Sequence, residues 1–334
     1  CIKNQDYDHN NMEVVLVDGA STDNTRALMC EFALDNKDEF RRVVVLDNPK
    51  KTLPSGWNVA LREYKGDAII KVDAHAVIPE DFVSKNVRVL ETGEYICGGQ
   101  RPNIIDKPTP FKETLLLAES SMFGSSIASY RNNPGKTYVK SLFHAAYRRE
   151  VFEKVGFFNE ELVRTEDNEI HYRMRKAGYK LCFDPDIISY QYTRSSLKAM
   201  LKQKYANGYW IGKTSKVCPK CLSIYHFVPF AFVSAIIASG SVIGATGLAE
   251  CIKKRHNHTL GKGISALRKV TVVLTTVMWV LYALMASGMA AVSAFKAEDK
   301  RNITNACLPV LFLLLHLSYG IGTIAGLMDK SKRG

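Results

Sequence analysis

Acidic residues are missing from one long stretch of this 334-residue chain. Between Ile187 and Ala249 there is no Asp or Glu, although Lys and Arg recur there. This basic segment leads into an apolar run, as expected beside an anionic cytoplasmic membrane face, where each basic residue contributes on the order of 1 kcal/mol. No nucleic-acid-binding motif accompanies the positive charge, so nucleic acid is not an expected partner.

Charged side chains are also missing from three apolar runs near the carboxyl end. The runs cover residues 227–248, 270–292 and 308–328. At about 1.5 Å per residue each run can cross a hydrocarbon core of about 30 Å, and their position is not that of a signal peptide. A transporter is not expected, because the runs contain no Asp, Glu, Lys or Arg that could line a polar path. The sequence therefore predicts a multi-pass membrane region over residues 222–334.

The segment 195–221 ahead of these runs reads as a basic amphipathic helix. We expect it to lie in the membrane interface, with core packing against the amino-terminal domain as the alternative. If all three runs cross, the loop 249–269 with its six Lys or Arg lies opposite the amino-terminal domain, against the positive-inside tendency. A re-entrant hairpin at 227–248 would keep that loop cytoplasmic, and the sequence leaves both topologies open.

Cysteine spacing excludes two further classes of protein. The eight cysteines are scattered without a disulfide-like pattern, which fits a reduced compartment. Cys218 and Cys221 have CxxC spacing but lack a second pair of ligands, so no zinc site is expected.

No glycine-rich phosphate loop is present, yet an acidic residue ends each of three predicted strands. The predicted strands are short runs rich in β-branched residues at 13–18, 42–46 and 68–72. Predicted helices between them imply right-handed crossovers and a parallel sheet. Asp18, Asp47 and Asp73 should then share the carboxyl edge of the sheet, where ligands bind in open α/β folds.

Asp73 and His75 are two residues apart just after the third predicted strand. Both side-chain types bind divalent cations, so a cation that bridges phosphates is one interpretation of this pair. A polar turn after a strand is the plain alternative, and the other strand-end aspartates favour the cation.

A predicted helix after Thr165 places two carboxylates in its first turn. Thr165 is a suitable N-cap, Gly178 a suitable terminator, and apolar residues between them recur at helical spacing. Glu166 and Asp167 then lie where the helix dipole and free N–H groups favour ionised carboxylates. An ionised, positioned carboxylate can accept a proton from a hydroxyl nucleophile. Acidic residues are also simply common at helix starts, and the strand-end aspartates favour the catalytic interpretation.

Four motifs occur in the order and spacing found in family 2 glycosyltransferases, which the chain resembles over roughly residues 1–215. They are Val17–Thr25, Lys71–Ala76, Tyr147–Phe158 and Glu166–Glu169. The likeness is strongest to the bacterial exopolysaccharide branch, the succinoglycan-type glucosyltransferases, where Asp-Ala-His stands in place of Asp-x-Asp. Each motif is weak alone, and their combination is specific.

The resemblance implies an α/β fold, namely a GT-A nucleotide-sugar-binding domain with a mostly parallel sheet over residues 1–194, followed by C-terminal transmembrane helices. It implies Asp167 as the catalytic base of an inverting transfer, and Asp73 with His75 as ligands of Mg²⁺ or Mn²⁺. The implied donor-binding residues are Asp18, Asp47, Lys71 and Asp73. The implied acceptor-side or supporting residues are Glu166, Gln203 and Trp210.

The sequence departs from the family pattern in three places. It starts after the family's first apolar strand and polar turn, so we expect an unpaired edge on Glu13–Asp18 and a fragment of the full reading frame. Trp57-Asn58 stands where many relatives have arginine before asparagine, which removes one expected phosphate contact. Residues 203–207 lack the Gln-x-x-Arg-Trp pattern of processive synthases, so transfer of a single sugar is expected.

These features together predict a glycosyltransferase of the inner or plasma membrane with a cytoplasmic catalytic domain. It would move a sugar from a nucleotide-sugar donor, expected to be a UDP-sugar, to a lipid-linked saccharide in exopolysaccharide or capsule synthesis. Two alternatives are a polyprenyl-phosphate glycosyltransferase, whose phosphate acceptor needs little base catalysis, and a catalytically silent scaffold of a polysaccharide export complex.

Overall fold

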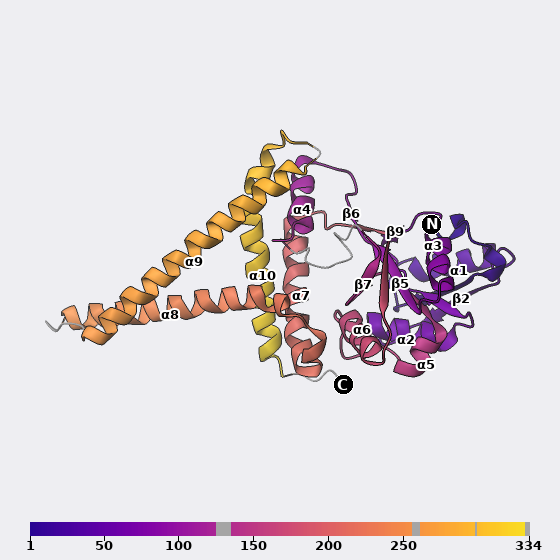
Figure 1. Ribbon diagram of the computed structural model, residues 1–334, viewed down its shortest axis with the longest axis horizontal. Helices are drawn as coiled ribbons and strands as arrows, with labels where there is room; N and C mark the ends of the chain where they lie inside the picture. Colours follow the sequence, from indigo (N-terminus) through magenta and orange to yellow (C-terminus); the bar gives the residue numbers. More distant parts are fainter. Residues whose placement is uncertain (125–134, 256–260, 298, 331–334) are drawn as a thin grey trace.

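The computed structural model describes residues 1–124, 135–255, 261–297 and 299–330. An α/β part contains the amino terminus and a helical part contains the last third of the chain, and the two lie side by side (Figure 1). The predicted class, an α/β domain followed by apolar helices, is therefore confirmed.

Three small sheets form the α/β part. The strands are β1 (Glu13–Asp18), β2 (Arg42–Asp47), β3 (Ala68–Ile70), β4 (Ala76–Val77), β5 (Ile96–Gln100), β6 (Asn103–Ile104), β7 (Thr137–Val139), β8 (Ala146–Arg148), β9 (Leu181–Ile188) and β10 (Tyr190–Tyr192). The sheet orders are β1-β2, β4-β10-β6 and β3-β8-β5-β9-β7.

Helices connect and cover these strands. The α-helices are α1 (Thr25–Asp35), α2 (Leu53–Glu63), α3 (Phe82–Glu91), α4 (Pro110–Ser120), α5 (Arg149–Val155), α6 (Glu166–Lys176), α7 (Leu197–Val217), α8 (Val228–Arg255), α9 (Lys262–Phe295) and α10 (Leu308–Met328). Short 3₁₀ turns are η1 (Ile2–Asn4), η2 (His9–Asn11), η4 (Pro219–Cys221), η5 (Ile224–Phe227) and η6 (Ile303–Cys307).

The prediction of a mostly parallel sheet is wrong, because β8 inserts between β3 and β5. β1 and β2 are parallel, as are β5 and β9 and β6 and β10, but β8 is antiparallel to both of its neighbours. The amide of Arg148 donates to Tyr95 O and that of Arg149 to Asp67 O, which extends both antiparallel ladders. β1 pairs only with β2 among the described strands, so Asp73 does not end a strand of the sheet that holds Asp18 and Asp47.

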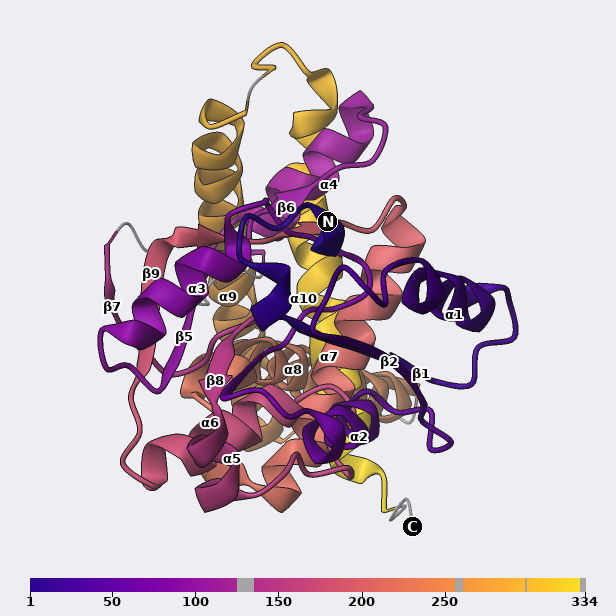
Figure 2. The same cartoon turned by 90° about the vertical axis from the view of Figure 1, so that its right-hand side faces the viewer.

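The five-stranded sheet has an apolar core on each face. Helices α2, α5 and α6 cover one face, and α3 covers the other (Figures 1 and 2). Successive strand residues point to opposite faces, so Ile96 faces the first core and Cys97 the second. The largest fully buried side chains of the first core are Ile96, Leu142, Tyr147, Ile170, Met174, Leu181 and Phe183.

Helix α7 lies along α10, and glycines set how closely their backbones approach. A Cβ atom at Gly208 would collide with the carbonyl oxygen of Tyr319, and one at Gly326 would collide with that of Tyr209. Small residues at such positions are typical of closely packed membrane helices. The segment predicted for the membrane interface thus packs along α10, a helix long and apolar enough to cross a membrane.

Helix α4 packs against the apolar helices at the carboxyl end of the chain. Leu115 and Ala118 are fully buried in one cluster with Phe312 of α10. The hydroxyl of Thr114 donates to Asn305 Oδ1 over 2.8 Å, which ties α4 to η6. Apolar contact with α10 therefore outweighs contact with the sheet for this helix.

Three helices among the described residues are long and apolar enough to cross a membrane, at Ile224–Lys253, Lys262–Phe295 and Ile303–Met328. They include the three predicted apolar runs. Helix α8 is continuous, so the alternative of a re-entrant hairpin at 227–248 is not observed. Helices α8 and α9 extend away from α10 and come together at their far ends (Figure 1).

Candidate active site

The segment after β3 positions Asp73. The amide of Lys71 donates to Ala145 O over 2.9 Å, and the chain then turns. Asp73 Oδ2 lies 3.7 Å from His144 Nε2, while the buried Oδ1 has no protein partner. Burial opposes ionisation of Asp73, but His144 and the Lys71 ammonium outweigh it and lower the carboxyl pKa to about 2. Asp73 is therefore an ionised carboxylate with one oxygen available to a ligand.

Side-chain contacts at Thr165 and at His171 hold the first two turns of helix α6. Thr165 is its N-cap residue as predicted, but its hydroxyl bonds to Thr214 of α7 and not to the helix amides. One turn into the helix, His171 bonds through Nδ1 to Ser141 Oγ over 3.1 Å and through Nε2 to Tyr147 OH over 2.8 Å. Burial lowers the pKa of His171 to about 3, so the ring is neutral. These contacts hold the start of α6 against the sheet and α7.

Lys71 joins the segment after β3 to the start of α6. Its Nζ lies 2.5 Å from Asp167 Oδ1 and 3.8 Å from Glu166 Oε1. The ammonium also lies over the rings of Trp57 and Phe158, at 5.2 Å and 5.7 Å from their centroids. A cation–π contact is stronger where water is excluded, and Lys71 is buried. The lysine predicted to bind the donor thus directly contacts the predicted base.

The charges around Lys71 favour an ionised Asp167. Burial opposes the lysine charge, but the nearby carboxylates, Asp167 first, outweigh it and raise the Lys71 pKa. Burial also raises the pKa values of both Glu166 and Asp167, so the two neighbouring carboxyls retain a proton more readily than in water. Because Asp167 makes the direct contact with the ammonium, Asp167 carries the charge and Glu166 carries the proton.

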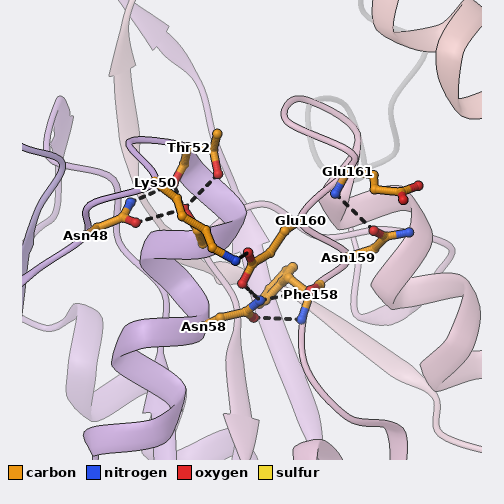
Figure 3. A network of polar contacts seen from close by, with 9 residues as sticks. Asn48, Lys50, Thr52, Asn58, Phe158, Asn159, Glu160 and Glu161 are labelled. Atoms are coloured by element: carbon orange, nitrogen blue, oxygen red, sulfur yellow. Dashed lines mark hydrogen bonds and ion pairs between the residues drawn. The ribbon is translucent and has the colours of Figure 1, made fainter. Parts of the chain in front are cut away.

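A polar network holds the loop after α5 against α2 (Figure 3). Asn58 donates to Phe158 O and accepts from Phe158 N, each over 2.9 Å, and also donates to Glu160 Oε1. Lys50 Nζ contacts the other oxygen of Glu160 over 2.7 Å. The asparagine that follows Trp57 therefore positions the loop whose Phe158 ring lies beneath the Lys71 ammonium.

The two other predicted donor-binding aspartates lie apart from this cluster. Asp18 is buried and accepts the amide of Ser21, which stabilises the turn after β1. Asp47 lies opposite Asp18 in the ladder, but its side chain is 64% exposed and pairs with Arg26 over 2.8 Å. Among the described residues, no hydrogen bond or ion pair joins either aspartate to Lys71. Asp47 stays a predicted donor-binding residue, and in this structure its carboxylate pairs with Arg26.

A divalent cation fits this site only if its other ligands come from the substrate. No cluster of three or more His, Cys, Asp or Glu that could hold a metal occurs within residues 1–124, 135–255, 261–297 and 299–330. Mg²⁺ is commonly held by one or two carboxylates together with substrate phosphates. The unpartnered Oδ1 of Asp73 suits that role, and His75 lies near enough to influence the Asp73 charge.

Gln203 and Trp210 lie on the face of α7 that meets the start of α6. Residues 203, 207, 210 and 214 share one helix face by spacing. Asn207 accepts a hydrogen bond from Arg164 over 3.0 Å, and Thr214 bonds to Thr165. Trp210 is buried there, and Gln203 Oε1 is buried without a hydrogen-bond partner. Both predicted acceptor-side residues are thus beside the loop that precedes Asp167.

Sequence reasoning missed the residues that support the cluster. His144 and His171 belong to no spacing motif, and only their positions next to strand β8 and within α6 could have suggested buried histidines. Ser189 bonds to His144 Nδ1 over 2.9 Å, and Gln191 lies 2.7 Å from His75. The alternation of Ser189 and Gln191 along an extended segment is the one signal that could have indicated a shared face.

A known protein-family profile matches the amino-terminal part of the chain. Residues 1–156 match the profile described as "Glycosyl transferase family 2". This match supports the GT-A interpretation of the α/β part.

Curated relatives with related descriptions match a larger part of the chain. The succinoglycan biosynthesis protein ExoA of Rhizobium meliloti is 30% identical over 203 residues, which is 59% of each protein. A Methanococcus voltae protein is 26% identical over 242 residues, 70% of this chain and 73% of the relative. It is named dolichyl N-acetyl-alpha-D-glucosaminyl phosphate 3-beta-D-2,3-diacetamido-2,3-dideoxy-beta-D-glucuronosyltransferase. A poly-beta-1,6-N-acetyl-D-glucosamine synthase of Staphylococcus epidermidis is 20% identical over 58% of this chain and 45% of its own length.

Among solved structures, residues 1–349 of S. aureus TarS in complex with UDP give a TM-score of 0.42 at 18% identity. The similarity covers 63% of this chain and 59% of that one.

Proposed function

We propose that the chain is a family 2 glycosyltransferase, whose profile matches its residues 1–156, and that it transfers a sugar from a nucleotide-sugar donor to a lipid-linked saccharide with inversion at the anomeric carbon. The observation that supports this most is the buried contact of 2.5 Å between Lys71 Nζ and Asp167 Oδ1. It joins a strand end, where a donor binds, to a helix start, where a base is ionised.

Asp167 is the proposed general base. Its carboxylate accepts the proton of the acceptor hydroxyl as that oxygen attacks the anomeric carbon from the face opposite the leaving diphosphate. The attacking oxygen forms the new glycosidic bond as the bond to the diphosphate breaks, which inverts the configuration. Lys71 keeps Asp167 ionised and oriented, and Glu166, protonated next to it, adds no competing charge.

Asp73 and His75 are the residues proposed to hold Mg²⁺ or Mn²⁺ on the donor diphosphate. When bound, the ion supplies Lewis-acid stabilisation of the charge that gathers on the leaving diphosphate. Asp73 contributes an ionised carboxylate whose Oδ1 has no protein partner, and Asp18 is proposed to contact the nucleotide base of a UDP-sugar.

The contact between the α/β part and the apolar helices supports the proposal of a lipid-linked acceptor. The N-cap of α6 bonds to α7 through Thr165 and Thr214, and α7 packs along the apolar helix α10. An acceptor held by its lipid beside these helices would reach the base from the α7 side, where Gln203 and Trp210 lie. We place the protein in the cell membrane with its α/β part in the cytoplasm, adding one sugar per acceptor. The description of the Methanococcus voltae relative, which names a dolichyl-linked sugar phosphate, agrees with a lipid-linked acceptor.

The test is sugar transfer by membranes that contain the full chain or its Asp167→Asn variant. General-base catalysis contributes about 10²- to 10⁴-fold, so we expect a rate loss of that size with lipid-linked saccharide acceptors. Asp81→Asn is the matched control, because Asp81 makes only an exposed pair with Lys85. Sugar transfer by the Asp167→Asn variant at a rate within a few-fold of the wild-type rate would contradict the proposal. Retained transfer to polyprenyl phosphate in that variant would identify the phosphate acceptor instead.

A further inference from the structure

Helix α7 is held by the α/β part at both of its ends. Just before its start, the amide of Thr193 donates to Ile104 O of β6 over 2.9 Å. Near its end, Thr214 bonds to Thr165, the N-cap residue of α6. The helix between these contacts has 21 residues and is about 30 Å long. A helix held at both ends by one domain lies along the surface of that domain, so α7 cannot have its ends on opposite sides of a bilayer.

Helix α10 follows α7 from start to end. Near the start of both helices, Met200 of α7 and Phe312 of α10 are fully buried in one cluster. At the end of both, Lys216 Nζ donates to Asp329 O over 2.9 Å. The two helices therefore run parallel, side by side, in both views of the molecule (Figures 1 and 2). Whatever orientation α7 has to the bilayer, α10 shares it.

The lysines of α7 also oppose a crossing by this pair of helices. Lys198, Lys202 and Lys216 are exposed. If α10 crossed the hydrocarbon core, α7 beside it would carry these ammonium groups through the core, where charged side chains are costly and rare. In the plane of the membrane interface, the same groups can reach water and anionic lipid headgroups.

One face of α10 is apolar and uncovered. Val310, Leu317, Ile321 and Met328 share this face, because they are seven, four and seven residues apart. All four are exposed or half-buried. The opposite face is buried in the cluster that α10 forms with α4, α7 and α9. A helix with one covered face and one apolar open face is suited to lie in the interface with the open face toward the lipid.

Helices α8 and α9 have a different relation to the rest of the protein. Only 6% of the apolar stretch of each is buried, against 39% for α10. Helix α8 runs sideways from α10 in Figure 1 and is seen nearly end-on in Figure 2, where α10 stays upright. The uncharged residues 228–249 and 270–295 are each long enough for a core of about 30 Å. Charged residues begin at the far end, where Glu250 pairs with Arg268.

We propose that α8 and α9 cross the bilayer as a hairpin, while α10 lies with α7 in the plane of the membrane interface and turns its Val310–Met328 face to the lipid. The chain then crosses twice, so the end of α10 is on the same side of the bilayer as the α/β part. The six Lys or Arg of residues 249–269 are on the opposite side, against the positive-inside tendency, as they would be with three crossings. The inference goes beyond the proposed function, because it rests on helix contacts and not on the transfer reaction.

The first experiment finds the side of the bilayer on which each segment lies. In the full chain, serine replaces the cysteines that are not buried, and single cysteines are then restored or introduced. The replaced residues are Cys1, Cys30, Cys218, Cys251 and Cys307. A membrane-impermeant maleimide is added to right-side-out and to inside-out vesicles. Lys330→Cys should react in the same vesicles as restored Cys1, and restored Cys251 should react only in vesicles of the other orientation.

The second experiment measures the depth of α10 with nitroxide labels. Val310→Cys, Leu317→Cys and Met328→Cys are labelled, and collision rates with oxygen and with a water-soluble nickel chelate report depth. The outer two labels are about 27 Å apart along the helix. A crossing helix would place them near opposite interfaces, with the Leu317 label near the bilayer centre. The in-plane helix should give all three a similar depth of about 5–10 Å. Leu281→Cys, midway along the uncharged part of α9, is the matched control and should be much deeper.

Two results would overturn the inference. Reaction of Lys330→Cys in the same vesicles as Cys251, or a Leu317 label as deep as the Leu281 label, would show that α10 crosses the bilayer. Reaction of Cys251 in the same vesicles as Cys1 would show that the hairpin does not cross. Sugar transfer by the same vesicles, and its loss in Asp167→Asn, tests the proposed function separately, so the two failures are distinguishable.

Discussion

Replacing Lys71 with methionine would test the ion cluster at the centre of the site. Methionine preserves most of the apolar stem but removes the ammonium that contacts Asp167 at 2.5 Å and Glu166 at 3.8 Å. Lys71 is 4% exposed, so water cannot replace the lost charge. Removing one partner of a buried ion pair costs about 3–5 kcal/mol of folding free energy, and we expect a loss of that size.

The variant should also change how activity depends on pH. Without the ammonium, burial raises the Asp167 pKa further, because the cation no longer opposes that effect. The base is then protonated near neutral pH, and the transfer rate should fall there and recover as the pH rises. A pKa rise of one unit lowers the ionised fraction about tenfold once the pKa exceeds the assay pH, and it corresponds to about 1.4 kcal/mol.

Two measurements on the purified full chain check these expectations. Denaturant unfolding in detergent, followed by tryptophan fluorescence, gives the change in stability, and transfer rates between pH 6 and about 9 give the profile, a range that brackets the usual assay region. The double variant Lys71→Met, Asp167→Asn removes the unpaired charge, so it should regain much of the stability but none of the activity. A single variant that loses less than about 1 kcal/mol, the scale of an exposed pair, and keeps the wild-type pH profile would refute the reasoning.

Three further predictions concern other parts of the structure. Glu166 has a pKa raised from 4.5 to about 8 by burial, so its contribution to stability is complete below pH 4.5 and is lost as the pH rises through about 8. Glu166→Gln should remove that decline between pH 4.5 and about 8 in unfolding experiments, and an unchanged decline would assign it to another group. Asn58→Leu breaks both hydrogen bonds to the Phe158 backbone and should cost about 1–3 kcal/mol, whereas a thermal midpoint equal to that of the wild type would show that the loop does not need this clamp. Gly212→Leu places a side chain where the Thr323 carbonyl lies, so size-exclusion profiles should show loss of folded protein, and a wild-type profile would contradict the close packing of α7 on α10.

The sequence predicts contacts between residues close together in the chain, and it predicts contacts between distant residues far less well. The N-cap at Thr165 and the terminator at Gly178 were predictable because capping is local, and Gly178 indeed has φ +96°. The ion pair between Lys71 and Asp167 joins residues 96 apart, so only the family resemblance suggested that these two positions are close.

Contacts made by sheet topology were not predictable. Strand β8 follows β7 in the chain but inserts between β3 and β5, a placement that no spacing rule fixes, and this makes the sheet mixed. His144 reaches Asp73 for the same reason, since it immediately precedes that strand. Helix α4 has an apolar face that would suit the sheet or α10 equally well, and only the tertiary structure decides between them.

The most direct test of the central claim compares binding with turnover in Asp167→Asn. The variant should bind Mn²⁺ and UDP as wild type does, because Asp167 contacts neither in the proposed mechanism, while the rate of sugar transfer to a lipid-linked saccharide falls about 10²- to 10⁴-fold. Transfer at a rate close to that of the wild type would contradict the claim that the carboxylate held by Lys71 is the base.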